Sequence, residues 1–279
     1  MRVALSSALA LLAVVAGAVA QGQPRPPGPP TDARPRASDR PPEIVPPEAV
    51  PRPPPQPIDW TAKWDELWKR RDEDAAIKQL NLLIKDRIAQ DPNGFETSWR
   101  LSSLLDWEAD GQPDGSTAKA GMGKGAWEWG DKAILANPED VRGHYFGGTG
   151  VGLYSEGVGI LTALSQGLEG KFRERLLAAL RIDKDFLQGA PQVVWGRYFY
   201  KLPWPKRDVS ESIKVLSAVV KAHPGNWRAK IYLADSLADD GKEAEAKKLV
   251  RDVLDGAGGQ DPPEEKRVKE LARKWISQH

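Results

Sequence analysis

The chain has 279 residues with 40 basic and 39 acidic side chains, so its formal net charge at neutral pH is +1. A charge this close to zero provides no strong field to attract nucleic acid or an anionic membrane, and neither is predicted as a partner. The chain contains no cysteine, which excludes disulfides, thiolate catalysis, cysteine-based metal sites and a lipid anchor on a cysteine.

Residues 1–20 are typical of a secretory signal peptide. One basic residue, Arg2, precedes an apolar run, and small residues at Ala18 and Ala20 suit a cleavage site. The run is short for a membrane-spanning helix of ~20 residues, so we expect cleavage after Ala20; retention as an anchor is the alternative. The sequence therefore predicts an exported protein, periplasmic or secreted, with no transmembrane segment after cleavage.

Residues 21–58 hold 15 of the 24 prolines and almost no large apolar side chains. Such a segment buries too little apolar surface to offset its conformational entropy, and its prolines favour extended backbone. We predict a disordered proline-rich linker, with a docking strip for a proline-binding domain as the alternative.

Helical periodicity dominates residues 59–279, which contain all eleven tryptophans. Trp60, Trp64 and Trp68, for example, recur at every fourth position, and no segment alternates with the period of two expected of a strand. Proline cannot continue a helix, so three proline-containing segments predict helix ends, at 91–94, 137–140 and 223–226. The region is predicted to be all-α.

Residues 226–254 have the pattern of a tetratricopeptide repeat (TPR), a helix–turn–helix unit with large and small residues at fixed positions. Small residues recur in the first helices of successive units, at Ser102, Gly148, Gly196 and Ala234. Every spacing between them exceeds the usual ~34 residues, so helices or turns must be lengthened. We predict an irregular TPR-like solenoid of helical hairpins, about four to five pairs, followed by a C-terminal capping helix over 262–279.

Seven glycines fall within residues 143–159. The run lacks the glycine spacing of a dinucleotide-binding loop and the Gly-Lys-Ser/Thr of a phosphate-binding loop, and no strand precedes it. Since Gly148 also falls at a small first-helix position, we predict that these glycines allow close packing between helices.

A longer motif lies in residues 176–216. A helix ends at Asp183 and a Gly-Ala-Pro turn follows at 189–191; the next helix carries Gly196-Arg197-Tyr198-Phe199, and after it come Leu202-Pro203 and Asp208. In this the chain resembles the T component of TPR-associated TRAP transporters and, more distantly, the regulators of microtubule dynamics. The resemblance covers about 59–255. It implies a helical periplasmic protein that binds an apolar ligand in a central pore or docks a periplasmic solute-binding protein.

The residues available for catalysis are few. His144, His223 and His279 are the only histidines, and none has the spacing of a metal site. We therefore predict a protein that is not an enzyme and uses no metal or cofactor. A buried pair of converging carboxylates would instead favour a hydrolase.

Stacked helical hairpins present a concave surface that suits a protein or peptide partner. The first-helix residues expected to face this groove are Trp99, Arg100, Arg142, Tyr145, Arg197, Tyr200 and Arg228. Aromatic and arginine side chains are enriched at binding hot spots, and arginines here would suit an acidic or carboxylate-bearing ligand. The alternatives are ordinary helix packing and ion pairing of each arginine with a local acid such as Glu96, Glu139 or Asp235. A carrier of an apolar small molecule, with a pore lined by glycines of 147–159 and by residues 198–200, is the second functional hypothesis.

Overall fold

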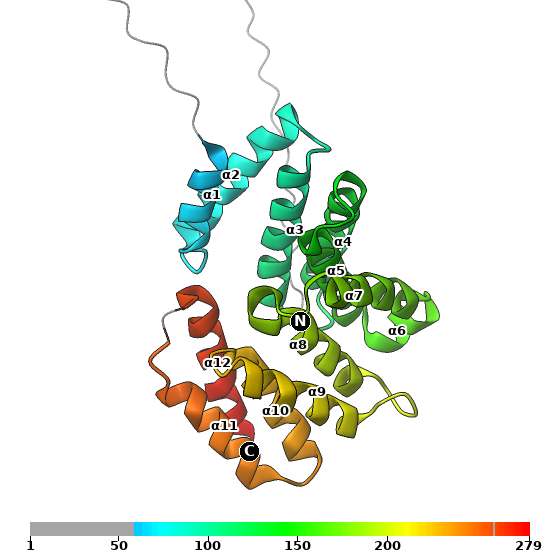
Figure 1. The fold of residues 1–279 in the computed structure, drawn as a ribbon, viewed down its shortest axis with the longest axis vertical. Coiled ribbons are helices and arrows are strands. Elements are labelled where there is room, and N and C mark those ends of the chain that lie inside the picture. The colour runs from blue at the N-terminus through cyan, green and yellow to red at the C-terminus, as the bar shows by residue number, and fades with distance from the viewer. Residues whose placement is uncertain (1–58, 259) are drawn as a thin grey trace, which may run out of the picture. The chain divides into compact units, whose positions relative to one another are not determined.

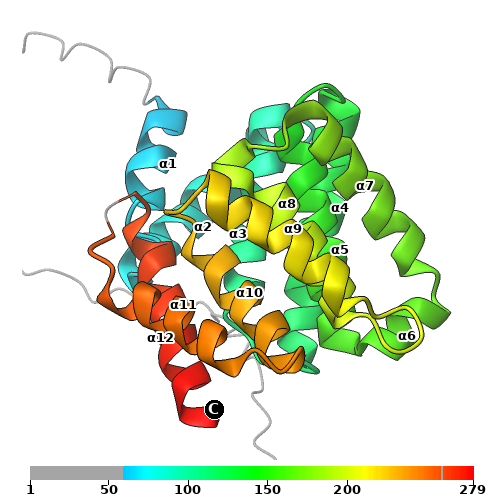
Figure 2. The same ribbon diagram turned by 60° about the horizontal axis from the view of Figure 1, so that its bottom comes forward.

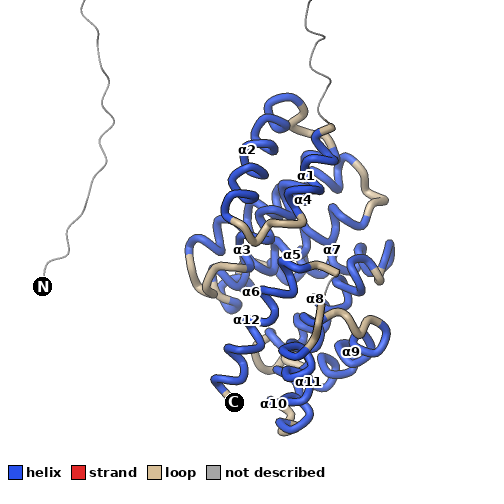
Figure 3. Tube along the Cα trace, turned by 90° about the vertical axis from the view of Figure 1, so that its left-hand side faces the viewer, coloured by secondary structure: helices blue, strands red, loops and turns tan. Residues whose placement is uncertain are grey.

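The computed structural model describes residues 59–258 and 260–279, so the predicted signal peptide and proline-rich linker lie outside the described residues. The described chain forms twelve helices and no strand (Figure 3), which confirms the all-α prediction. The helices are α1 (Trp60–Trp68), α2 (Asp74–Gln90), α3 (Phe95–Asp110), α4 (Thr117–Ala136), α5 (Val141–Val158), α6 (Ile160–Ser165), α7 (Leu168–Asp183), α8 (Phe186–Lys201), α9 (Val209–Ala222), α10 (Trp227–Asp239), α11 (Glu243–Asp255) and α12 (Pro262–Gln278).

Successive helices pack as hairpins that follow one another from α1 to α11, and α12 packs against the last pair (Figure 1). This is the predicted TPR-like solenoid. It is irregular because the short helix α6 is inserted between α5 and α7. Two glycines make this insertion geometrically accessible: Gly159 and Gly167 have φ values of 91° and 71°, which L side chains rarely adopt.

The helix ends follow the predicted local signals. The helices before the three proline-containing segments stop at Gln90, Ala136 and Ala222. The helices that follow two of these segments begin at capping residues: Asp140 accepts a hydrogen bond from the amide of Arg142, and Asn226 does the same for Ala229.

Small residues lie where first and second helices touch. The hydroxyl of Ser102 donates to the carbonyl of Ala126 on α4 at 2.7 Å. A Cβ atom on Gly196 would lie 2.6 Å from Cγ of Leu216 on α9. The predicted small positions therefore do bring helices into close contact.

The glycine-rich run forms α5, and its glycines meet the backbone of α4. A Cβ atom on Gly150 would lie 2.4 Å from the amide nitrogen of Trp127, and one on Gly157 would lie 2.4 Å from that of Ala120. Real Cβ atoms are not found so close to other atoms, so only glycine permits this approach. The helix-packing interpretation of the run is confirmed.

Three clusters of buried apolar side chains form the core. One joins α1, α2 and α3, a second joins α5, α6 and α7, and a third joins α8 to α12. None of them links α12 to α1, α2 or α3 within the described residues. No helix in the described part of the chain is both long and apolar enough to span a membrane.

Candidate binding cavity

The N-terminal end of α12 lies beside the turn between α1 and α2, at the opposite end of the helix order (Figures 1 and 2). Two ion pairs join these segments. Arg71 contacts Asp261 with an N–O distance of 2.6 Å, and Lys266 contacts Asp72 at 2.9 Å. The curvature of the solenoid thus brings its last helix back to its first turn.

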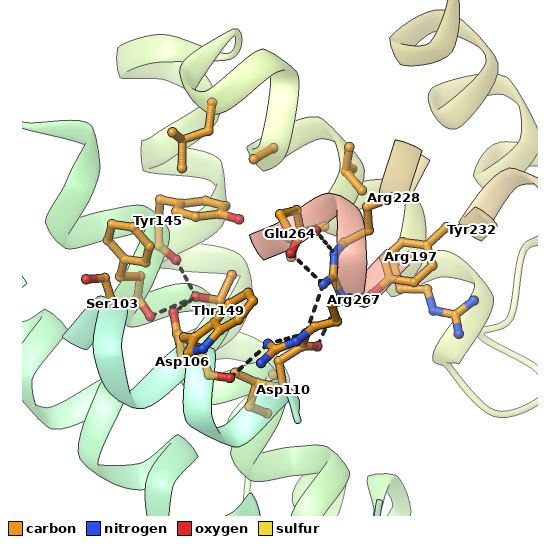
Figure 4. Close-up of a pocket in the computed structure, with 18 of the residues that line it drawn as sticks. Ser103, Asp106, Asp110, Tyr145, Thr149, Arg197, Arg228, Tyr232, Glu264 and Arg267 are labelled. Carbon is orange, nitrogen blue, oxygen red and sulfur yellow. Dashed lines mark hydrogen bonds and ion pairs between the residues drawn. The ribbon is translucent and has the colours of Figure 1, made fainter. Parts of the chain in front are cut away.

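The centre of this closure is Asp110, at the C-terminal end of α3. Its carboxylate accepts hydrogen bonds from Arg228 of α10 at 2.9 Å and from Arg267 of α12 at 3.1 Å. Arg228 also contacts Glu264 of α12 at 2.6 Å (Figure 4), and Arg267 stacks over the ring of Trp107. We call the contacts of Asp110, Arg228, Glu264 and Arg267 the closing network.

The closing network borders a cavity of about 720 Å³ on the concave side of the first helices. This volume falls within the ~300–1,000 Å³ of small-molecule sites. Apolar side chains of α5 to α8 form much of the wall, among them Phe146, Ile160, Ala163, Leu168, Phe172, Val193 and Val194. Charged side chains also line it; those of α3, α10 and α12 include Asp106, Asp110, Arg228, Glu264 and Arg267, and others come from α1, α5, α7 and α8. The cavity is therefore amphipathic.

Five of the seven predicted groove residues line this cavity: Trp99, Arg142, Tyr145, Arg197 and Arg228. The other two do not. Arg100 is 5% exposed and pairs with Glu96 instead, while Tyr200 lies between the guanidinium groups of Arg197 and Arg207, outside the lining. The repeat alignment placed both residues on the correct helices. However, Arg100 contacts Glu96 and Tyr200 contacts two arginines, and neither side chain lines the cavity.

The prediction that the glycine run lines a pore is wrong for most of these glycines. Gly152 is the glycine of that run that lines the cavity, whereas Gly150 and Gly157 face α4. Tyr198 lines the cavity and Tyr200 does not. The apolar lining comes from aromatic and aliphatic side chains because the glycines are occupied in helix packing.

Every arginine of the lining has an acidic partner. Arg142 pairs with Asp140 at 2.7 Å and Arg197 pairs with Asp235 at 2.6 Å. Arg71 pairs with Asp261, and Arg228 and Arg267 belong to the closing network. The expectation that these arginines stand ready for a carboxylate-bearing ligand is therefore not supported; the ion-pair alternative describes them.

Sequence reasoning missed Asp106, one turn before Asp110 on α3. Its side chain is 8% exposed; Oδ2 accepts a hydrogen bond from the hydroxyl of Thr149, and Oδ1 has no hydrogen-bond partner in the described structure. Burial raises the pKa of this carboxyl well above its usual range, by more than the hydrogen bond from Thr149 lowers it. The available signal was spacing, since Asp106 follows Trp99 and Ser103 on one helical face.

Aromatic rings surround the neighbourhood of Asp106. Tyr145 and Phe146 lie one turn before Thr149 on α5, and Thr149 also donates to the carbonyl of Tyr145 at 3.1 Å. The ring centroids of Tyr145 and Phe186 are 5.5 Å apart, and those of Phe146 and Phe186 are 6.2 Å apart. The Tyr145 hydroxyl points into the cavity (Figure 4). Burial raises its pKa, and the charge of Asp106 adds to this effect.

Asp106→Asn is expected to raise the free energy of unfolding at pH 7 by about 1–2 kcal/mol, the order of an unpaired buried polar group. A carboxyl with a raised folded pKa binds its proton more tightly when folded, so wild-type stability declines as pH rises from ~4 through that pKa. The variant lacks this decline, and the difference should vanish below pH ~4. Urea unfolding of both proteins across this pH range measures it; a variant less stable than wild type at pH 7 would contradict the prediction.

The histidines lie away from the cavity. His144 contacts the carbonyl of Pro138, His223 contacts Asp185 at 3.1 Å, and His279 stacks on Trp275. No group of three or more potential metal ligands occurs among the residues that the structure describes. That the protein is not an enzyme remains a prediction.

The carboxyls of buried Asp106 and half-buried Asp110 do not form the converging pair expected of a hydrolase. They lie one turn apart on α3, and the carboxylate of Asp110 is occupied by Arg228 and Arg267. The two groups therefore have different roles: Asp110 holds helices together, and Asp106 faces the cavity.

Fold and cavity define an all-α, TPR-like protein built of helical hairpins. A search of solved structures finds similarity to the crystal structure of MamA, at 18% sequence identity and a TM-score of 0.41, over 74% of this chain and 96% of that one. A likeness this distant carries no argument about function. No protein-family model and no curated protein matches the chain.

Proposed function

We propose that this chain is a non-catalytic binding protein that holds a small amphipathic molecule in the cavity bordered by α12. The observation that supports the proposal is the cavity itself: its volume is about 720 Å³, and apolar side chains of α5 to α8 line much of its wall. Removing an apolar ligand from water against such a wall favours binding by ~25 cal/mol per Å² of apolar surface.

A protein or peptide partner is the second candidate, and the construction of the closing network favours it. Because no apolar cluster joins α12 to α1, α2 or α3 in the described chain, polar and stacking contacts hold the concave face shut. Charge pairs of this kind are sensitive to competing charges and salt. A protein or peptide that displaced α12 could then bind to the concave surface of the hairpins.

The location and the transport role are proposed from the sequence. The signal-peptide pattern of residues 1–20 supports export to the periplasm or the exterior. The motif in 176–216 supports a role beside a solute-binding protein of a transport system, as in the T components that the chain resembles. Both proposals are tested by locating the mature protein in cell fractions and by recovering what it binds there.

Val194→Trp should abolish most ligand binding by filling the part of the cavity lined by apolar side chains, to which Val194 of α8 belongs. The probe is 1-decanol, an uncharged amphipathic molecule, titrated calorimetrically. Displacing two methylene groups of the probe, at ~0.8 kcal/mol each, corresponds to an affinity loss of about tenfold or more. Leu135→Trp is the matched control, because Leu135 is 85% exposed and lies outside the lining.

The proposal requires saturable binding of 1-decanol to the wild-type protein and to Leu135→Trp. Equal affinity in Val194→Trp, when its urea midpoint matches that of wild type, would place the binding elsewhere. Absence of saturable binding to wild type would refute the cavity as a site for amphipathic molecules.

A further inference from the structure

The charged groups of the cavity differ in whether they have partners. The five arginines of the lining are paired with Asp261, Asp140, Asp235, Asp110 and Glu264. Lys201, at the end of α8, contacts Glu156 at 3.0 Å and Asp114 at 3.1 Å. An anionic head group that approached the arginines or Lys201 would have to displace one of these acids; Lys69, which also lines the cavity, is exposed to solvent.

Asp106 is the opposite case. Its side chain is more than nine-tenths buried, lines the cavity and has one oxygen, Oδ1, without a hydrogen-bond partner in the described structure. No basic side chain contacts it. A buried carboxyl left in this condition costs free energy in the unliganded protein, and a ligand that donates hydrogen bonds to it removes that cost.

The surroundings of Asp106 determine which kind of hydrogen-bond donor on a ligand it favours. The rings of Tyr145, Phe146 and Phe186 form one cluster beside it, and Trp99 stacks on Phe146 with 6.1 Å between centroids. Aromatic faces attract cations, and do so more strongly where water is excluded. The Tyr145 hydroxyl forms no hydrogen bond in the described structure and points into the same cavity (Figure 4).

We propose that the ligand of this cavity is an amphipathic amine, whose ammonium group binds the carboxyl group of Asp106 among these rings while its apolar part lies against α5 to α8. The inference rests on the proposed function and specifies its ligand class. The ammonium group favours the ionised form of Asp106, which then supplies the counter-charge that no other side chain of the lining has free, and the aromatic cluster stabilises the cation. Binding leaves the closing network intact, since it uses none of its residues.

The test uses three probes with the same ten-carbon chain: decylamine, 1-decanol and decanoate, titrated at neutral pH, where the amine is protonated. Wild type should bind decylamine about tenfold or more tightly than 1-decanol, because hydrogen bonds to charged groups contribute ~1.5–3 kcal/mol. Decanoate should bind most weakly. Asp106→Asn should lose the preference for the amine and keep its affinity for 1-decanol.

Glu108→Gln is the matched control. Glu108 is a half-buried carboxyl on the same helix that accepts a hydrogen bond from Asn81 and lies outside the cavity lining. The Glu108→Gln variant should bind all three probes with the affinities of the wild-type protein. A preference for the amine that survives in Asp106→Asn, or tightest binding of decanoate by wild type, would overturn the amine assignment alone. Failure of all three probes to bind would overturn the proposed function together with it.

Discussion

Gly150→Ala is expected to lower the free energy of unfolding by about 2–3 kcal/mol. The added Cβ would lie 2.4 Å from the amide nitrogen of Trp127 and 2.9 Å from the carbonyl carbon of Ala126, both in the backbone of α4. Backbone atoms in a helix cannot move aside as a flexible side chain can. Helices α4 and α5 would have to separate, and their packed neighbours with them.

The control is Gly121→Ala on α4, where an added Cβ would meet no atom within 4 Å. Alanine favours a helix over glycine by roughly 0.5–1 kcal/mol, so this variant should be as stable as wild type or slightly more so. Urea denaturation of the three proteins measures the difference in midpoint. Equal midpoints for Gly150→Ala and wild type would show that α4 and α5 are not in backbone contact.

Asp110→Asn should destabilise the protein by about 2–4 kcal/mol, since it leaves Arg228 and Arg267 without their shared carboxylate. The side chains of this cluster are 19–28% exposed, which places the expected loss toward the lower end. Hydrogen exchange should also speed up along α12, because the network fixes that helix against α3. The exposed ion pair of Lys124 and Glu128 provides the control: Glu128→Gln should change stability by less than ~0.5 kcal/mol.

The effect of Asp110→Asn should depend on pH. Burial raises the pKa of Asp110, but the guanidinium groups of Arg228 and Arg267 lower it by more, so the net pKa lies below the ordinary value. A carboxylate with a depressed pKa stabilises the fold above the unfolded value of ~4, and that stability is lost as pH falls through the folded pKa. Wild type and variant should therefore converge in acid. A constant difference down to low pH would contradict the ion-pair account.

Much of the fold was accessible from local sequence. The prolines at 92, 138 and 224 predicted the ends of α2, α4 and α9, because proline lacks an amide donor and restricts the residue before it. The small residues Ser102 and Gly196 predicted helix contacts, because close approach tolerates no larger side chain there. These are short-range rules, and each acts within one helix or one hairpin.

The candidate site was accessible only in part. Trp99, Arg142 and Tyr145 were placed on the concave face by repeat alignment, and they line the cavity. The acids that pair with the arginines were predicted in part: Glu96 contacts Arg142 and Asp235 contacts Arg197, but the pairing of Arg228 with Asp110 and Glu264 depends on the tertiary structure. Tyr200 shows the limit of this prediction. Helical periodicity gives the approximate direction of a side chain but does not tell which neighbour it contacts. The ring of Tyr200 contacts the guanidinium groups of Arg197 and Arg207 and does not line the cavity.

The sequence by itself determined that this protein is helical, where most of its helices end and which small residues allow them to touch. Tertiary structure alone decided that the concave face is closed. Asp110 meets Arg228 and Arg267 across 118 and 157 residues of chain, a distance set by small rotations accumulated over every hairpin in between. The same rotations place Asp106 beside a cavity and without a basic partner. The surroundings of a buried side chain come from other helices, and the sequence of its own helix does not determine where those helices lie.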